Sequence, residues 1–117
     1  MGSHGEVQGI GTHWELWMLG SGGLKNHEVL RIGTQTSAEA IGLGKDVGSI
    51  EVGKLADLQV LDANPLEQLT NTNTIRYVMK NGRLYDAATL NEMWPRDQKL
   101  VRQWWKRGDV AADGGMK

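Results

Sequence analysis

The strongest constraint on the fold of this chain is the segment TIRYVMKNGRLYD, residues 74–86. Residues 75–80 alternate so that Ile75, Tyr77 and Met79 share one face of an extended strand. Asn81 and Gly82 follow, and this dipeptide suits a two-residue type I′ turn because both residues tolerate positive φ. The sequence therefore predicts a β-hairpin over residues 75–86.

A second β-favouring segment, GSIEVGKLADLQVLDANP, occupies residues 48–65. The spacing of apolar residues changes after Gly44 from helical to strand-like. We predict short extended runs on both sides of a turn at Gly53 and Lys54. The apolar residues of these runs are Ile50, Val52, Leu58, Val60 and Leu61.

The first 24 residues contain one segment with the features of a helix, THWELWMLG at residues 12–20. Thr12 is the expected N-cap, and Glu15 is its capping-box partner three residues later. The GSGG segment at residues 20–23 should end this helix. Trp14 and Trp17 lie three apart on it and are expected in the core, with a substrate pocket as the alternative.

The segment KNHEVLRIGTQTSAEAIGLG, residues 25–44, predicts two short helices that meet at a bend near residues 33 and 34. Asn26 is the expected cap of the first helix, and Thr36 or Ser37 is the expected cap of the second. Gly44 suits the left-handed position that closes a helix.

The segment ATLNEMWPRDQKLVRQWWKRG, residues 88–108, predicts helix on both sides of Pro95, which would start a new helix at its first turn. The apolar stripe of that helix would be Leu100, Val101, Trp104 and Trp105. The expected fold class is α+β: two or three short helices, a small and mostly antiparallel sheet with a hairpin, and a C-terminal helix.

Composition excludes several classes of function. A formal net charge of −1 gives no basic field for nucleic acid, and we read the RQWWKR segment as an amphipathic helix that docks on its own sheet or on a partner. The chain has no cysteine, so a metal would need His and carboxylate ligands. The sequence has neither an apolar run of membrane-spanning length nor the pattern of a signal peptide, which favours a soluble protein with no membrane partner.

The order of helices followed by GSIEVGKLADLQVLDANPLEQL and IRYVMKNGRLYD resembles the C-terminal end of a metal-dependent amidohydrolase, of the imidazolonepropionase-like and Xaa-Pro dipeptidase-like kind. The resemblance extends over about residues 2–94. The positions that match the family pattern in order are Gly48, Gly53, Lys54, Ala56, Asp57, Asp62, Pro65, Asn81 and Gly82.

The resemblance implies three parts. Residues 1–46 would be the remnant of the last barrel strand and its helices, residues 47–86 half of a composite β-sandwich with the hairpin, and residues 87–117 a helical tail. A (β/α)8 barrel usually needs about 250 residues, so most of a barrel does not fit into 117 residues. We therefore expect a fragment, a remnant gene product or one part of a split enzyme. Uncovered apolar strand edges would favour self-association or pairing with a barrel-bearing chain.

The resemblance also implies where chemistry would lie. Members of the family hold a divalent metal such as zinc, whose bound water attacks a C–N bond. His4 falls where the superfamily has a metal-contacting Asp that takes a proton from that water, and this departure puts the usual base in doubt. His4 remains a candidate metal ligand, with Glu6 and His13 as candidate substrate-side groups. The alternative is that His4 belongs to a flexible end or a vector remnant.

Other polar residues have simpler interpretations. His27 is expected in an exposed or capping role on its helix. Asp57 and Asp62 are expected to bind backbone amides at turns rather than to act as a catalytic carboxylate pair. Because a catalytic zinc takes about three protein ligands, we expect that this chain alone retains no metal.

Three functions follow from these observations. The first is the C-terminal fragment of a hydrolase that acts on C–N bonds of small substrates, inactive alone. The second is an oligomerisation or interaction module built on the half-sandwich and the Trp-rich tail. The third is a minimal metal-binding protein that uses His4 and His13 across a homo-oligomer interface.

Overall fold

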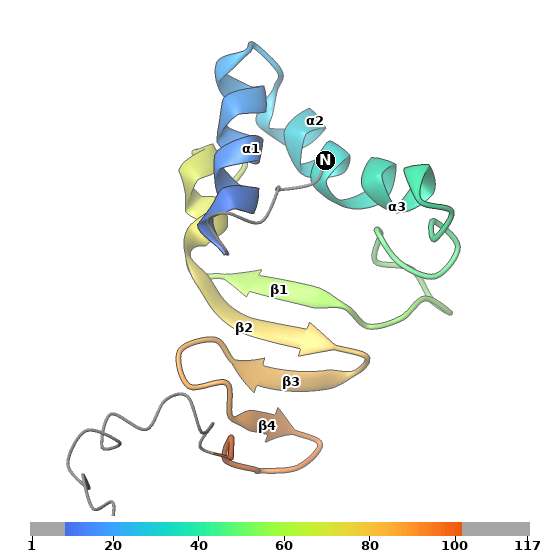
Figure 1. Cartoon of the computed structure of the whole chain (residues 1–117), viewed down its shortest axis with the longest axis vertical. Coiled ribbons are helices and arrows are strands. Elements are labelled where there is room, and N and C mark those ends of the chain that lie inside the picture. The colour runs from blue at the N-terminus through green and yellow to red at the C-terminus, as the bar shows by residue number, and fades with distance from the viewer. Residues whose placement is uncertain (1–8, 102–117) are drawn as a thin grey trace, which may run out of the picture.

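The computed structural model describes residues 9–101, in which short helices lie above a four-stranded antiparallel sheet (Figure 1). The helical part contains α1 (Ile10–Ser21), α2 (Asn26–Arg31), a π-helical turn η1 (Ile32–Thr36) and α3 (Ser37–Ala40). The sheet contains β1 (Leu58–Leu61), β2 (Ile75–Lys80), β3 (Arg83–Asp86) and β4 (Glu92–Trp94), and a 3-10 turn η2 (Leu69–Asn73) precedes β2. The α+β expectation is confirmed at this level.

The sheet is a simple meander in which each strand pairs with the next one along the chain, in the order β1-β2-β3-β4. The predicted hairpin is confirmed, with Lys80 opposite Arg83 in the register of β2 and β3. Asn81 and Gly82 have φ angles of 49° and 75°, as the mirror-image turn requires. The hairpin is therefore specified by local sequence.

The small core lies between α1, α2 and η2 rather than on a face of the sheet. Leu16, Val29 and Leu69 form its buried cluster, against which Trp17, Leu19 and Leu30 pack. A Cβ at Gly20 would lie 2.7 Å from Cδ2 of Leu69, so a glycine there lets α1 approach η2 closely. Among the described residues, no helix is both long enough and apolar enough to cross a membrane.

The predicted boundaries of the helices need correction. Helix α1 begins at Ile10 after Gly9, whose φ is 82°, so Thr12 lies inside the helix and is not its cap. The expected bend is a continuous helical path through η1, because Thr36 and Ser37 both have right-handed helical φ and ψ and neither is an N-cap.

The end of this helical path is at Gly42, not at the expected Gly44. Gly42 has a φ of 79°, and its N–H donates to the carbonyl of Glu39 at 3.0 Å. The N–H of Leu43 donates to the carbonyl of Ala38 at 2.8 Å. These two bonds are those of a Schellman motif, which needs its left-handed residue directly after the helix.

One strand prediction and one helix prediction were wrong. Residues 50–57 contain no strand: Ile50 and Val52 are exposed, and the turn at Gly53 joins irregular segments. The helix expected before and after Pro95 is absent from residues 88–101, which instead contain β4 and an antiparallel bridge between Glu92 and Gln98. Residues 102–108 of that predicted helix, with Trp104 and Trp105, lie outside the described residues.

Pairing with β3 explains why this segment is not helical. Backbone bonds of 2.9 Å run in both directions between Glu92 and Gln98. The nearly buried carboxylate of Glu92 receives two hydrogen bonds from Arg96, at 3.1 Å from Nε and 2.7 Å from Nη2. Arg96 thereby lowers the pKa of Glu92, and a paired charge can be buried where an unpaired one cannot. Tertiary pairing outweighs the local helical preference.

Candidate functional site

His13 is the one predicted site residue that lies within the described part of the chain. Its Nδ1 is 3.1 Å from the hydroxyl of Thr72, so a residue of α1 contacts η2 across 59 positions of sequence. Thr72 is almost fully buried, with 4% of its surface exposed. His4 and Glu6 lie outside the described residues, so their expected roles remain predictions.

The hydroxyl of Thr72 connects two side chains of α1. Nε1 of Trp17 donates to it at 3.0 Å and is also 3.1 Å from the carbonyl of Leu69. The Thr72 oxygen keeps a second lone pair and its own proton, so the tautomer of His13 decides which of the two groups donates in the Nδ1 contact. A neutral imidazole satisfies this contact with its proton on either ring nitrogen. Burial of His13 lowers its pKa, which favours the same neutral form.

His13 and Trp17 therefore hold α1 against η2. Trp17 packs against the core as expected, whereas Trp14 is 48% exposed and was wrongly expected to be buried. Trp14, Trp17, Met18 and Ser21 line a shallow cleft of about 340 Å³ on α1. A substrate-side role for His13 would have to use Nε2, since Nδ1 is occupied by the Thr72 contact.

The described residues do not fit a metal ion. Across residues 9–101, no group of three or more His, Asp or Glu side chains lies close enough to hold one. His13 reaches a threonine and a tryptophan rather than a carboxylate. A catalytic zinc would need further protein ligands.

Asp57 and Asp62 do not form a carboxylate pair. Asp57 Oδ1 accepts the N–H of Asn81 at 2.6 Å, and its Oδ2 pairs with Lys80, so it binds the hairpin turn from outside. The Lys80 contact and then the Asn81 N–H hold the pKa of Asp57 below its usual value. The side chain of Asp62 instead pairs with Arg76 at 3.3 Å, which differs from the backbone contact that we expected.

Lys54 of the motif binds groups within the loop that follows the helical path. Its Nζ donates to the carbonyl of Gly44 at 2.8 Å and to the hydroxyl of Ser49 at 2.5 Å. The carboxylate of Glu51 is 3.2 Å away. Only 13% of the Lys54 side chain is exposed, so this ammonium is unavailable to a substrate in the described structure.

Gly48 of the same motif lies against the helical path. A Cβ on it would come within 2.7 Å of the Cβ of Ala38 and 3.0 Å of the Cα of Gln35, and its φ is 98°. Both the space and the backbone angle require glycine. Gly48 thus packs the loop of residues 44–57 against the helices, Lys54 forms bonds within the loop, and Asp57 attaches its end to the hairpin.

Sequence reasoning missed a cleft beside the π-helical turn. His27 is exposed on α2, as expected, and it lines this cleft together with Arg31, to which we had assigned no role. The available signal was the pair of residues at positions 27 and 31, one helical turn apart and both able to carry positive charge. Nothing in the local sequence indicated the π-helical turn itself.

The sequence of the helices, β1, β2 and the hairpin matches a known family of proteins. The Amidohydrolase family model matches residues 11–85, more than half of the chain, and the chain belongs to this family. A 5'-deoxyadenosine deaminase of Methanobrevibacter smithii is 41% identical over 63 residues, which cover 50% of this chain and 14% of that protein. An imidazolonepropionase of Shouchella clausii is 45% identical over 60 residues, covering 49% and 13%.

A solved structure supports the same assignment. The crystal structure of a Xaa-Pro dipeptidase with methionine in its active site matches with a TM-score of 0.63 and 32% identity, over 68% of this chain and 20% of that one. The expected resemblance to imidazolonepropionase-like and Xaa-Pro dipeptidase-like enzymes is confirmed. The chain spans about a fifth or less of the length of these relatives.

Proposed function

We propose that this chain supplies the C-terminal portion of an amidohydrolase that cleaves C–N bonds of small substrates, and that it is not catalytic alone. The observation that carries the proposal is the use of the family motif: Gly48, Lys54 and Asp57 all make structural contacts. In residues 9–101 no metal-holding group accompanies them. The motif therefore accounts for assembly and leaves the chemistry to other parts of an amidohydrolase.

In this proposal the divalent metal belongs to a barrel that this portion accompanies. The metal would activate water for attack on an amide or related carbon. His4 and Glu6 would approach that site from the start of the chain, and His13 would hold α1 in place behind them. Composite β-sandwich formation would bury the sheet and the segment before β1.

Metal content separates this proposal from a minimal metal-binding protein. Elemental mass spectrometry on gel-filtered chain, prepared without chelator, should find far less than one zinc or manganese ion per chain. Hydrolysis of small amides, including N-acyl prolines, should not exceed the rate of a His4→Ala variant. About one retained ion per chain, lost in His4→Ala but kept in His27→Ala, would overturn the proposal and favour the minimal metal protein.

An interaction module is the second candidate, and exposed apolar surface favours it. Ile50 and Val52 are 86% and 108% exposed on the segment before β1, and Val60 is 46% exposed on β1 itself. Strand β1 is at the end of the described sheet, so one of its edges has no strand partner there. An unpaired strand edge with exposed apolar side chains beside it favours association with another chain.

Sedimentation velocity tests this second candidate. A module that associates through β1 and the exposed segment before it should form dimers or larger species, and Val52→Glu should return it to monomers. Met18→Glu, at a 73% exposed position on α1, is the matched control and should leave association unchanged. A monomer that binds a barrel-bearing amidohydrolase chain would favour the first proposal instead.

A further inference from the structure

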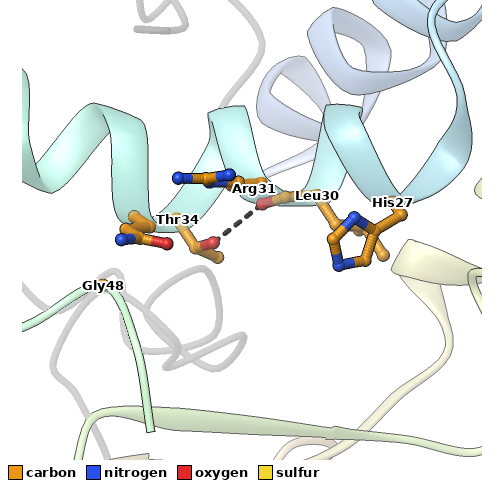
Figure 2. Close-up of a pocket in the computed structure, with 6 residues that line it drawn as sticks. His27, Leu30, Arg31, Thr34 and Gly48 are labelled. Carbon is orange, nitrogen blue, oxygen red and sulfur yellow. Dashed lines mark hydrogen bonds between the residues drawn. The ribbon is translucent and has the colours of Figure 1, made fainter.

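A cleft of about 310 Å³ lies between the helical path and the loop at Gly48 (Figure 2). The helical path supplies His27, Leu30, Arg31, Thr34 and Gln35 to its lining. His27 and Arg31 are one turn apart on α2, so both side chains lie on the same side of the helix. A volume of this size accommodates a small organic molecule.

The π-helical turn fixes the polar groups next to this cleft. The Thr34 hydroxyl donates to the carbonyl of Leu30 at 2.8 Å, and the Ser37 hydroxyl donates to the carbonyl of Ile32 at 2.6 Å. These side chains satisfy carbonyls of the widened turn, and single π-helical turns occur often at functional sites. With its proton donated to Leu30, the Thr34 hydroxyl faces other groups as an acceptor only.

Arg31 is positioned to receive an anion. None of the ion pairs within residues 9–101 includes Arg31. The two carboxylates nearest in sequence have other contacts: Glu28 accepts the N–H of Lys25 at 2.9 Å, and Glu39 accepts Nε2 of Gln35 at 3.0 Å. The guanidinium therefore presents a planar fork of donors that the helix itself does not use.

We propose that this cleft binds the carboxylate of a small organic acid, with Arg31 as its bidentate partner and His27 as a second donor. One guanidinium matches the single charge and planar shape of a carboxylate. A phosphate usually takes several cations or the free N–H groups of a helix N-terminus, whereas these residues lie at the end of α2 where it runs on into η1. Leu30 gives the aliphatic part of the acid an apolar contact.

Titration of the full chain with butyrate, followed by two-dimensional amide NMR, tests this proposal. We expect saturable shifts at residues 27–35 and 48, with a dissociation constant of about 1–10 mM for so small a ligand. Butyramide has the same shape without the charge and should produce at least tenfold weaker binding. Inorganic phosphate should produce small shifts that do not saturate.

Two variants locate the binding residue. Arg31→Gln should weaken butyrate binding at least tenfold while leaving the dispersion of the amide spectrum unchanged, because Arg31 is exposed. Arg83→Gln removes an equal charge from an exposed position on β3 and should bind butyrate like the unmodified chain. His27→Ala should weaken binding by about threefold.

The proposal is overturned if the unmodified chain shows no saturable shifts, if butyramide binds as well as butyrate, or if Arg31→Gln binds unchanged. Tighter binding of phosphate than of butyrate would also overturn it. Because this titration involves neither metal nor hydrolysis, its outcome is independent of the proposed amidohydrolase role.

Discussion

Replacing Lys54 by Met tests whether this residue of the family motif stabilises the loop of residues 44–57. The change keeps an unbranched side chain of similar length but removes the ammonium that binds the Gly44 carbonyl and the Ser49 hydroxyl. A hydrogen bond to a charged group contributes about 1.5–3 kcal/mol. Both oxygens are half-buried and can bind water afterwards, so we expect a loss of about 2 kcal/mol rather than the full sum of two such bonds.

Urea unfolding followed by tryptophan fluorescence measures the global part of this loss. The midpoint should fall with an unchanged m value. The loop can also open locally, so hydrogen exchange at the amide of Leu55, which donates to the carbonyl of Asp46 at 2.8 Å, should accelerate by about 30-fold. Lys45→Met is the matched control, because Lys45 is exposed, and it should stay within about 0.5 kcal/mol.

The reasoning about Lys54 is refuted if Lys54→Met leaves both the unfolding midpoint and the Leu55 exchange rate where Lys45→Met leaves them. A fall in stability equal for both variants would also refute it, because the effect would then come from lost surface charge. Lys54→Arg should recover only part of the loss, since a planar guanidinium does not reproduce the three directions of an ammonium.

Three further predictions concern the turn, the loop glycine and pH. Gly82→Val should destabilise the chain by about 1–2 kcal/mol, because a β-branched residue resists a φ of 75°, while Gly82→Asn should be tolerated; an unchanged melting temperature in Gly82→Val would contradict the turn assignment. Gly48→Ala should cost about 2 kcal/mol or more in urea unfolding, and adding Ala38→Gly should recover part of it; a neutral Gly48→Ala would show that the helix and loop are not in contact. Burial lowers the folded-state pKa of His13 below 6.5. The contribution of neutral His13 to the free energy of unfolding should therefore be complete above about pH 6.5 and be lost as pH falls toward the folded-state pKa. Melting temperatures from pH 7.5 to 5 should show a slope that His13→Gln reduces and His27→Gln keeps.

The hairpin shows what sequence alone can predict. Its register and turn depend on residues within 12 positions of one another, and Asn81-Gly82 indicates the turn from local sequence. The prediction for Ile50 and Val52 failed because β propensity needs a neighbouring strand, and none pairs with residues 50–57 in the described structure. The helix prediction around Pro95 failed for the opposite reason. Strand β3 pairs with β4 there, and the local sequence of residues 88–101 does not indicate this partner.

The candidate site was less predictable than the fold. His13 was chosen as a candidate from its residue type and its closeness in sequence to His4, but its contact is with Thr72, 59 positions away, which sequence periodicity does not indicate. Arg31 was missed because the sequence does not show whether Glu28 or Glu39 forms an ion pair with it, and both have other contacts in the structure. Site chemistry depends on which polar groups are already satisfied, and that information exists only in three dimensions.

The contacts of the motif also explain why family membership and activity must be argued separately in this chain. Lys54 holds together the loop that follows the helical path, whereas Asp57 joins the same loop to the hairpin turn. Both contacts form within residues 9–101 and need no metal or substrate. A sequence can therefore keep the motif as long as the helices must stay attached to the sheet, whether or not a catalytic centre is nearby. Activity therefore does not follow from the motif contacts.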